Sequence, residues 1–327
     1  MNPTRLHSRV LRVSPRLSAV VSVSLVAGCA PPGLLDAPSK EALELALTQT
    51  IMDPTVTCEE LRANFRVEYL PLVETPDQAG LAYEEHWIPT PDGEFLHVWY
   101  LPTVLDRGTV VLAQGAAGAM PCYLYLAKLM IDNGWSLVMF DYHGFGASSG
   151  RVALASVPGD LELALDWALQ RTGREQVTLM GVSLGTIPAV AVAVQRPEAV
   201  NAVVLDSPVV LGDQFSRLAF ALQDPQEFID RLDPELVSDR IIDRLTAPLL
   251  IFAGSRDILT PPESARRLYD LAAGPKRLVE FDGVPHARGP YREPGLYSFN
   301  LEMFLSWTWS QEVSFDAFFA RIPAPNP

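Results

Sequence analysis

The sequence contains few cysteines, few histidines and few positive charges, and these shortages exclude classes of function. Its 327 residues include 3 Cys and 5 His, with no Cys-x-x-Cys pair or histidine-rich spacing. A structural zinc site is therefore effectively excluded, and we expect no metal and no organic cofactor. Lys and Arg total 25 against 39 Asp and Glu, a net charge of −14. Such a chain repels phosphate backbones, so we expect no nucleic-acid partner.

The composition is that of a globular protein without internal repeats. Hydrophobic residues make up 48% and charged residues 20% of the sequence. These values exclude a disordered chain, a coiled coil, collagen and a polytopic membrane protein. The length allows two domains, but one large α/β domain with a substantial core fits equally well.

An arginine-rich start precedes a short apolar stretch, Leu17–Val26, which is too short to span a bilayer as a permanent helix. This pattern predicts an export signal. It ends in Val26-Ala27-Gly28-Cys29, which resembles the lipobox of bacterial lipoproteins; an ordinary secretory signal with a chance cysteine is the alternative. We expect residues 1–28 to be a lipoprotein signal peptide. Lipid on Cys29 then anchors the protein to a membrane of the bacterial cell envelope, on its periplasmic or extracellular face.

The other two cysteines, Cys58 and Cys122, lie in a compartment that permits disulfides. A bond between them would attach the N-terminal extension to the segment around Cys122. Two buried free thiols are the alternative, and the sequence leaves both open.

The remaining pattern predicts an α/β fold. Residues 29–65 are expected to form a tether and an amphipathic helix, Lys40–Met52, and Leu81–Leu101 a two-stranded hairpin. Short apolar runs then alternate with helical stretches, which is typical of a parallel sheet with crossover helices. The predicted strands are Thr109–Ala113, Trp135–Phe140, Gln176–Met180, Ala202–Leu205, Pro248–Ala253 and Arg277–Phe281, and the predicted helices between them are Tyr123–Asn133, Gly159–Arg171, Leu184–Gln195 and Glu263–Ala272.

Two further segments complete the predicted domain, residues 66–322. The acidic stretch 209–246 shows no strand pattern and is expected to be a small helical lid over the strand ends. Tyr297–Phe319 carries large apolar residues, Phe299 among them, at helical spacing, so we expect a helix packed on the sheet. The fold class is thus a doubly wound, mostly parallel sheet with an N-terminal antiparallel hairpin.

A candidate nucleophile, Ser183, stands in Gly181-Val182-Ser183-Leu184-Gly185, between a predicted strand and a predicted helix. A sharp strand-to-helix turn needs both glycines, because side chains there would collide with neighbouring backbone. The turn places the hydroxyl at the carboxyl edge of the sheet, where such folds bind ligands. The alternative is a serine that merely caps the helix.

Ser183 needs a base and an acid, and two later strands supply candidates. His286 directly follows the last predicted strand, and Asp257 follows the strand before it. Because parallel strands end at one edge, all three side chains are expected to meet there, His286 as the base and Asp257 as the acid that holds it. Asp206 competes for the acid role, and Asp257 is alternatively a turn residue.

With these residues in this order, the sequence resembles the α/β-hydrolase superfamily of esterases, lipases and serine aminopeptidases, over roughly Val67–Arg321. The segment Asp141-Tyr142-His143-Gly144-Phe145-Gly146-Ala147-Ser148 is similar to the family's D-x-x-G-x-G-x-S loop. The resemblance implies an oxyanion hole made by the backbone N–H groups of Ala116 and Leu184. Gln114 replaces the usual histidine of that loop, and Pro188 lies early in the helix after Ser183.

These features predict a serine hydrolase that cleaves carboxylic esters, such as small acyl esters, acylglycerols or lysophospholipids, through an acyl-enzyme. A peptidase or amidase of the same fold and a non-catalytic binding lipoprotein are the alternatives. A dinucleotide oxidoreductase is disfavoured, because Gly115-x-x-Gly118 lacks the full G-x-G-x-x-G pattern.

Overall fold

The computed structural model describes residues 40–65, 73–213, 229–310 and 313–320. The predicted signal peptide, Cys29 and residues 214–228 of the predicted lid lie outside these ranges. Within them, no helix combines the length and the apolar character needed to cross a membrane.

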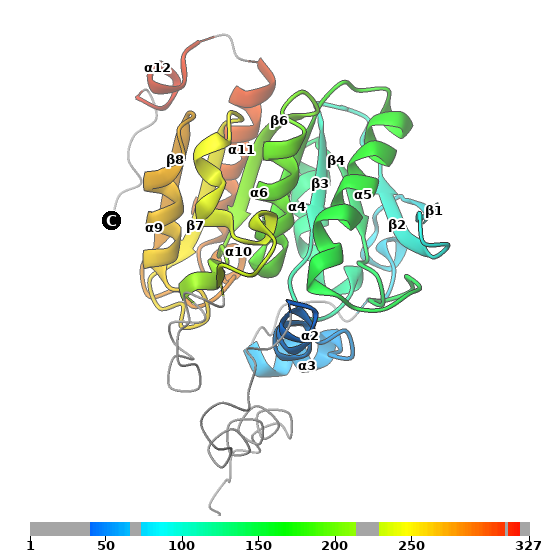
Figure 1. Cartoon of the computed structure of the whole chain (residues 1–327). Helices are drawn as coiled ribbons and strands as arrows, with labels where there is room; N and C mark the ends of the chain where they lie inside the picture. Colours follow the sequence, from blue (N-terminus) through cyan, green and yellow to red (C-terminus); the bar gives the residue numbers. More distant parts are fainter. Residues whose placement is uncertain (1–39, 66–72, 214–228, 311–312, 321–327) are drawn as a thin grey trace, which may run out of the picture.

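An eight-stranded sheet forms the centre of the protein, in the order β1-β2-β4-β3-β5-β6-β7-β8 (Figure 1). The strands are β1 Glu84–Pro89, β2 Phe95–Leu101, β3 Thr109–Ala113, β4 Ser136–Phe140, β5 Val177–Val182, β6 Val200–Asp206, β7 Leu249–Gly254 and β8 Lys276–Phe281. Strand β2 pairs antiparallel with β1 and β4, and the other neighbours are parallel. The predicted fold class is confirmed, and each predicted strand is present with ends shifted by at most two residues.

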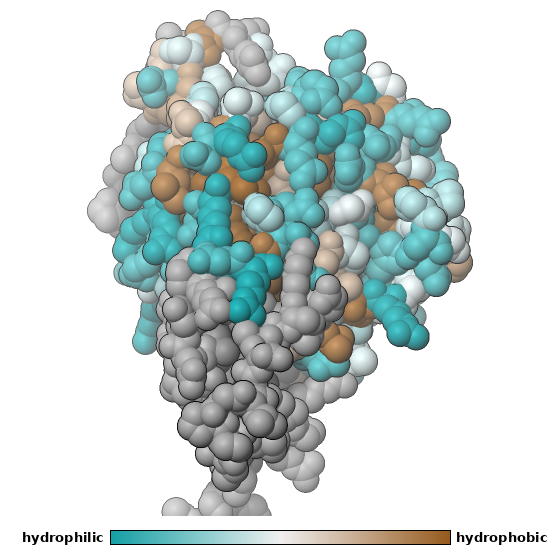
Figure 2. Space-filling view, in the orientation of Figure 1, coloured by the Kyte–Doolittle hydropathy of each residue, from teal (hydrophilic) through white to brown (hydrophobic). Residues whose placement is uncertain are grey.

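Helices cover both faces of the sheet. Helices α5 (Val157–Thr172), α6 (Thr186–Gln195) and α9 (Pro262–Leu271) pack on one face, and α4 (Leu124–Asp132) and α11 (Pro294–Ser310) on the other. Strands β3 to β7 are therefore buried along their whole length, which explains their continuous apolar sequences. Hydrophilic side chains cover much of the outer side of the α5, α6 and α9 layer (Figure 2).

Short helices complete the described chain: η1 Pro76–Ala79, η2 Met120–Tyr123, η3 Leu154–Ser156, η4 Ser183–Gly185, η5 Pro234–Leu236, η6 Ser238–Arg240, η7 Ile242–Arg244, α10 Gly289–Arg292 and α12 Phe315–Phe319. Three of these, η5 to η7, form the described end of the predicted lid, so this part consists of single 3-10 turns rather than a longer helix. Pro234 at the first position of η5 fixes where that turn begins, because the N–H that proline lacks would have no partner within the helix there.

The C-terminal segment differs from the prediction in two ways. Helix α11 ends at Ser310, and α12 begins separately at Phe315. The hydroxyl of the preceding residue, Ser314, caps α12 by accepting a hydrogen bond from the Ala317 N–H at 3.4 Å. The packing of α11 on the sheet is confirmed by its buried residues, such as Tyr297 and Phe304. Phe299 is 43% exposed, because it lies two residues from Tyr297 and hence on the opposite side of the helix.

The N-terminal extension contains the predicted helix, α2 (Lys40–Ile51), and a second helix that was not predicted, α3 (Cys58–Phe65). The sequence does carry a signal for α3. The Thr57 N–H donates to Glu60 Oε2 at 2.9 Å and the Glu60 N–H donates to Thr57 Oγ1 at 3.2 Å, which is a capping box.

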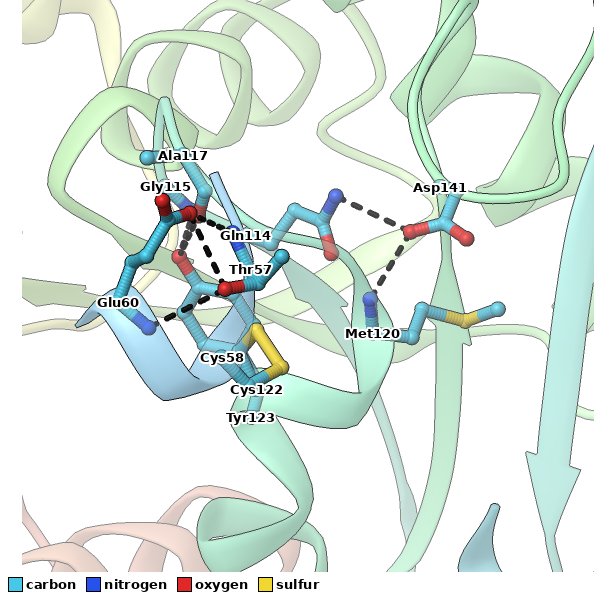
Figure 3. Close-up of a disulfide and its surroundings, with 10 residues drawn as sticks. All are labelled: Thr57, Cys58, Glu60, Gln114, Gly115, Ala117, Met120, Cys122, Tyr123 and Asp141. Carbon is cyan, nitrogen blue, oxygen red and sulfur yellow. Dashed lines mark hydrogen bonds between the residues drawn. A yellow bond between two sulfur atoms is a disulfide. The ribbon is translucent and has the colours of Figure 1, made fainter. Parts of the chain in front are cut away.

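A disulfide joins this extension to the domain that contains the sheet. Cys58 at the start of α3 is bonded to Cys122 in η2, with their Cα atoms 5.0 Å apart (Figure 3). Of the two alternatives that the sequence left open, the structure contains the paired one. Leu47 and Met52 of the extension are buried in the core as well, so residues 40–65 are part of the folded domain.

Candidate active site

In the turn after β5, Ser183 has a strained backbone conformation that the residues around it stabilise. Its φ is 52°, in the left-handed region that is unfavourable for a residue with a side chain. A Cβ on Gly181 would lie 2.3 Å from the Gly185 carbonyl oxygen, and a Cβ on Gly185 would lie 2.0 Å from the Ala113 carbonyl oxygen. Both glycines are therefore required, as the sequence pattern predicted, and Ser183 begins η4 as a strained turn residue.

The structure brings the three predicted side chains together. Ser183 Oγ lies 2.9 Å from Nε2 of His286, and Nδ1 of His286 lies 2.7 Å from Oδ2 of Asp257. These distances allow the serine hydroxyl to donate to Nε2 while the Nδ1–H donates to the carboxylate. Ser183 and His286 are half-buried, and Asp257 is buried. The nucleophile and base are thus open to a substrate, whereas the acid is not.

Asp257 is held as a carboxylate by several donors. Its Oδ1 accepts hydrogen bonds from the N–H groups of Leu259 and Thr260, and its Oδ2 accepts one from the Thr260 hydroxyl at 2.7 Å. Burial raises the pKa of Asp257, but the bonds from His286 and Thr260 and the nearby imidazole charge outweigh it, so the pKa lies below its ordinary value. Asp257 can therefore orient the imidazole and stabilise its positive charge without taking the proton.

Asp206, the competing acid, faces different partners. Its Oδ2 accepts a hydrogen bond from the Tyr297 hydroxyl at 2.9 Å, and its Oδ1 accepts one from Ser207 Oγ at 3.1 Å. Burial raises the pKa of Asp206 to about 6. Ser207 Oγ also accepts the N–H of Ala287, beside His286, at 2.9 Å. Asp206 thus supports the loop that carries the base, while Asp257 contacts the imidazole itself.

The predicted oxyanion loop lies against the nucleophile. A Cβ on Gly115 would lie 3.5 Å from Ser183 Cβ, which places the loop beside the serine. Gln114, the residue that departs from the family pattern, donates from Nε2 to Asp141 Oδ1 at 3.2 Å. Ala116 follows in this loop, and Leu184 follows Ser183, so both predicted N–H donors are in the segments that border the serine hydroxyl.

Asp141 organises the loops around it. It follows β4, where the disfavoured dinucleotide alternative would need an acid that binds the ribose. Besides Gln114, its Oδ1 accepts the Met120 N–H at 2.9 Å (Figure 3). A Cβ on Gly146 would lie 1.9 Å from Asp141 Oδ2, so the D-x-x-G-x-G-x-S loop wraps closely around this carboxylate. An acid whose oxygens are engaged by its own protein is poorly placed to bind a dinucleotide ribose.

The other described histidines lie elsewhere and pair with carboxylates. His86 contacts Glu84 at 3.0 Å, His97 contacts Glu85 at 2.7 Å and His143 contacts Asp160 at 2.6 Å. Among the described residues, no group of three or more His, Cys, Asp or Glu side chains is arranged to hold a metal ion.

Comparisons with known proteins identify the family of this chain. The family model described as "Serine aminopeptidase, S33" matches residues 106–242, a range that includes the oxyanion loop and Ser183. An uncharacterized protein of Mycobacterium tuberculosis is 33% identical over 203 residues, which cover 61% of this chain and 70% of that protein. The α/β hydrolase domain-containing protein WAV2 of Arabidopsis thaliana is 26% identical over 65% of this chain and 75% of its own. The chain belongs to the α/β-hydrolase superfamily.

Solved α/β-hydrolase structures share the fold at low sequence identity. An esterase of Pyrococcus furiosus superposes with a TM-score of 0.60 at 19% identity, over 71% of this chain and 95% of the esterase. A monoacylglycerol lipase of Paleococcus ferrophilus gives a TM-score of 0.52 at 21% identity, over 65% and 99% of the two chains. The sequence predicted Ser183, Asp257 and His286, which the structure brings together, but it did not predict Thr260 and Ser207, whose contacts with Asp257 and Asp206 no short motif signals.

Replacing Asp206 by Asn is expected to change how stability depends on pH. In the folded protein its pKa is about 6, against roughly 3.9 in an unfolded chain. The contribution of Asp206 to stability is therefore complete below pH 4 and is lost as the pH rises through 6, which amounts to about 3 kcal/mol. Asp206→Asn removes that loss. Its free energy of unfolding relative to the wild type should rise by about this amount between pH 4 and pH 8.

Urea unfolding of the wild type and Asp206→Asn across this pH range gives the difference between their free energies of unfolding. The contributions of the other titrating groups are the same in both proteins and cancel in this difference. Asp132→Asn, the same carboxylate-to-amide change at an exposed site, is the control. If the difference in unfolding free energy between Asp206→Asn and the wild type stayed constant across this range, the pKa of Asp206 would not be raised in the folded protein.

Proposed function

We propose that this protein is a serine hydrolase that cleaves carboxylic esters through an acyl-enzyme. The observation that carries the proposal is the continuous hydrogen-bonded series from Ser183 Oγ through His286 to Asp257. A neutral serine hydroxyl is a weak nucleophile, and this series supplies both a base and the group that orients it.

In the proposed mechanism, His286 Nε2 takes the proton of Ser183 as Oγ attacks the ester carbonyl. The N–H groups of Ala116 and Leu184 then stabilise the negative charge on the carbonyl oxygen, and each such donor contributes about 3 kcal/mol. His286 passes its proton to the leaving alcohol, and Asp257 stabilises the imidazolium in between. Water, deprotonated by the same imidazole, attacks the acyl-enzyme and releases the acid.

The preference for esters is supported by the solved relatives, which include an esterase and a monoacylglycerol lipase. Acylglycerols, lysophospholipids and small acyl esters are the substrate classes we propose. The family description "Serine aminopeptidase" favours one alternative, hydrolysis of aminoacyl amides by the same residues. A binding lipoprotein without catalysis is less compatible with a nucleophile and base in contact and open to solvent.

We further propose that the enzyme acts at a membrane of the bacterial cell envelope, held by lipid on Cys29. The support is the sequence alone: a basic start, the apolar stretch Leu17–Val26, and Val26-Ala27-Gly28-Cys29. A membrane anchor would bring the site close to lipid esters, which fits the proposed substrates.

The first prediction concerns the nucleophile and its partners. A fluorophosphonate probe should label the wild type covalently, and Ser183→Ala should abolish labelling, as measured by intact-protein mass. His286→Ala and Asp257→Asn should each lower kcat by about 10³-fold or more with folding intact. Asp206→Asn, the matched carboxylate control, should lose far less. If the two aspartate variants showed the reverse order, the acid would be Asp206; wild type that resists labelling would exclude the serine hydrolase.

The second prediction concerns the substrate class. Wild type should hydrolyse 4-nitrophenyl esters, and a series of graded acyl chain length should give a maximum in kcat/KM. Aminoacyl 4-nitroanilides, which present an amide to the same nucleophile, should react far more slowly. Turnover of the amides alone would show that the enzyme is a peptidase or amidase, with Ser183→Ala as the control for both series.

The third prediction concerns the anchor. Expression of the full chain in a bacterial host should give a membrane-bound protein whose mass includes acyl chains, because two or more chains suffice for stable anchoring. Cys29→Ser should remove that mass and release the protein from the membrane fraction. Membrane association that persists unchanged in Cys29→Ser would be evidence against lipid anchoring at this residue.

A further inference from the structure

We propose that Tyr123 and the disulfide-linked N-terminal segment, residues 40–65, position the Ala116 N–H for catalysis, so that the catalytic rate depends on an intact Cys58–Cys122 bond. This inference rests on the proposed function, in which Ala116 is an oxyanion donor. It is argued from three sets of contacts around Ala116.

The first contact is the Tyr123 side chain, which bridges the residues on both sides of Ala116. Its hydroxyl accepts the Gly115 N–H at 2.9 Å and donates to the Ala117 carbonyl oxygen at 3.3 Å. Burial raises the pKa of Tyr123 to about 12, so the hydroxyl keeps the proton that it donates. A Cβ on Gly115 would lie only 2.7 Å from the Tyr123 hydroxyl. One buried phenol thus fixes the loop before and after the donor residue.

The second contact comes from the N-terminal segment and reaches Ala116 directly. The Asp53 N–H donates to the Ala116 carbonyl oxygen at 2.8 Å, and Asp53 forms a parallel β-bridge with Ala117. Asp53 lies in a turn fixed by its own side chain, because Oδ1 accepts the Thr55 N–H at 3.1 Å. The backbone of Ala116 is therefore held from the side of the N-terminal segment as well as by Tyr123.

The third contact is the disulfide, which joins the other two. Cys122 is the neighbour of Tyr123 and is bonded to Cys58 (Figure 3). Cys58 begins α3, shortly after the turn at Asp53. A Cβ on Gly118, at the end of the oxyanion loop, would lie 2.7 Å from both Cys122 Sγ and Leu61 Cδ1. The loop end therefore packs against the disulfide and α3 together, and breaking the bond releases the segment at this point.

Loop position matters because an oxyanion donor acts only when it is aimed at the oxygen beforehand. A donor that must reorient during the reaction loses most of its effect, and a displacement of about 1 Å can cost about 100-fold in rate. Substrate affinity depends much less on this donor, since it meets charge that develops only in the transition state. Loss of the support should hence lower kcat more than it changes KM.

The test of Tyr123 uses Tyr123→Phe in the full chain with 4-nitrophenyl acetate as the substrate. We expect kcat to fall by about 10- to 100-fold with KM little changed. The control is Thr178→Val, which also removes a buried hydroxyl, bonded to Asn201 Oδ1 at 2.8 Å, at the opposite end of β5 from Ser183. It should keep the wild-type kcat. A Tyr123→Phe enzyme with wild-type kcat would overturn the proposal.

The test of the disulfide uses wild type and the Cys58→Ser/Cys122→Ser variant, each with and without dithiothreitol. Thiol–disulfide exchange leaves Cys58 and Cys122 as two thiols and converts the two thiols of the reagent into a cyclic disulfide. Reduction should lower the kcat of the wild type to that of the double variant, while the variant is insensitive to the reagent. Wild type that keeps its kcat, with both thiols shown free by alkylation and mass, would overturn the proposal.

Hydrogen exchange separates this inference from the proposed function. The bonded amides of Gly115 and Asp53 should exchange at least about tenfold faster in Tyr123→Phe and in the double variant, with strand β6 unchanged. Hydrogen exchange can be measured whether or not the protein is active, so it tests the contact between Tyr123 and the loop independently. If wild type fails to hydrolyse the ester, the proposed function is overturned, but the exchange result still decides whether this contact holds the loop. Active wild type with unchanged exchange in both variants would overturn the inference and leave the function intact.

Discussion

The proposed chemistry depends on one contact, the hydrogen bond between Ser183 Oγ and His286 Nε2. Topology provides it, because β5, β6, β7 and β8 are parallel neighbours and the residues that follow them emerge at one edge. The loops after β7 and β8 are bonded to one another as well, since the Arg256 N–H donates to the Val284 carbonyl oxygen at 3.0 Å. A Cβ on Gly254 would lie 2.2 Å from that oxygen. Acid and base are thus aligned by backbone contacts before their side chains meet.

Two buried aspartates at this edge, Asp257 and Asp206, have different pKa values because their hydrogen-bond partners differ. Asp257 gains bonds from His286 and Thr260, and its pKa falls below the ordinary value. Asp206 has fewer donors to offset its burial, and its pKa rises to about 6. A charged carboxylate is what an imidazolium needs beside it, and Asp257 keeps its charge to a lower pH than Asp206 does. The same residue type therefore contacts the imidazole of His286 at one strand end and supports a loop at the next.

The sequence predicted the elements and residues whose placement follows from chain order. In a parallel sheet, a residue directly after a strand has a known edge, so Ser183, Asp257 and His286 could be named together. The choice between Asp257 and Asp206 could not be made in this way, because both follow neighbouring strands. That choice depends on Tyr297 of α11, whose hydroxyl donates a hydrogen bond to the Asp206 carboxylate. Tyr123 and Asp53 are similar cases, since their contacts with the oxyanion loop arise only from packing, although Thr57 and Glu60 did signal the helix nearby.

The N-terminal segment connects the proposed anchor to the proposed site. Residues 40–65 touch the oxyanion loop through Asp53 and are joined to the domain by Cys58. Eleven peptide units lead from Cys29 to Lys40, a length that spans at most about 40 Å when extended. A lipid on Cys29 would therefore keep the start of α2, at Lys40, within about 40 Å of the bilayer. The same segment would then restrict both where Ser183 can meet a lipid ester and how the Ala116 N–H is aimed at it.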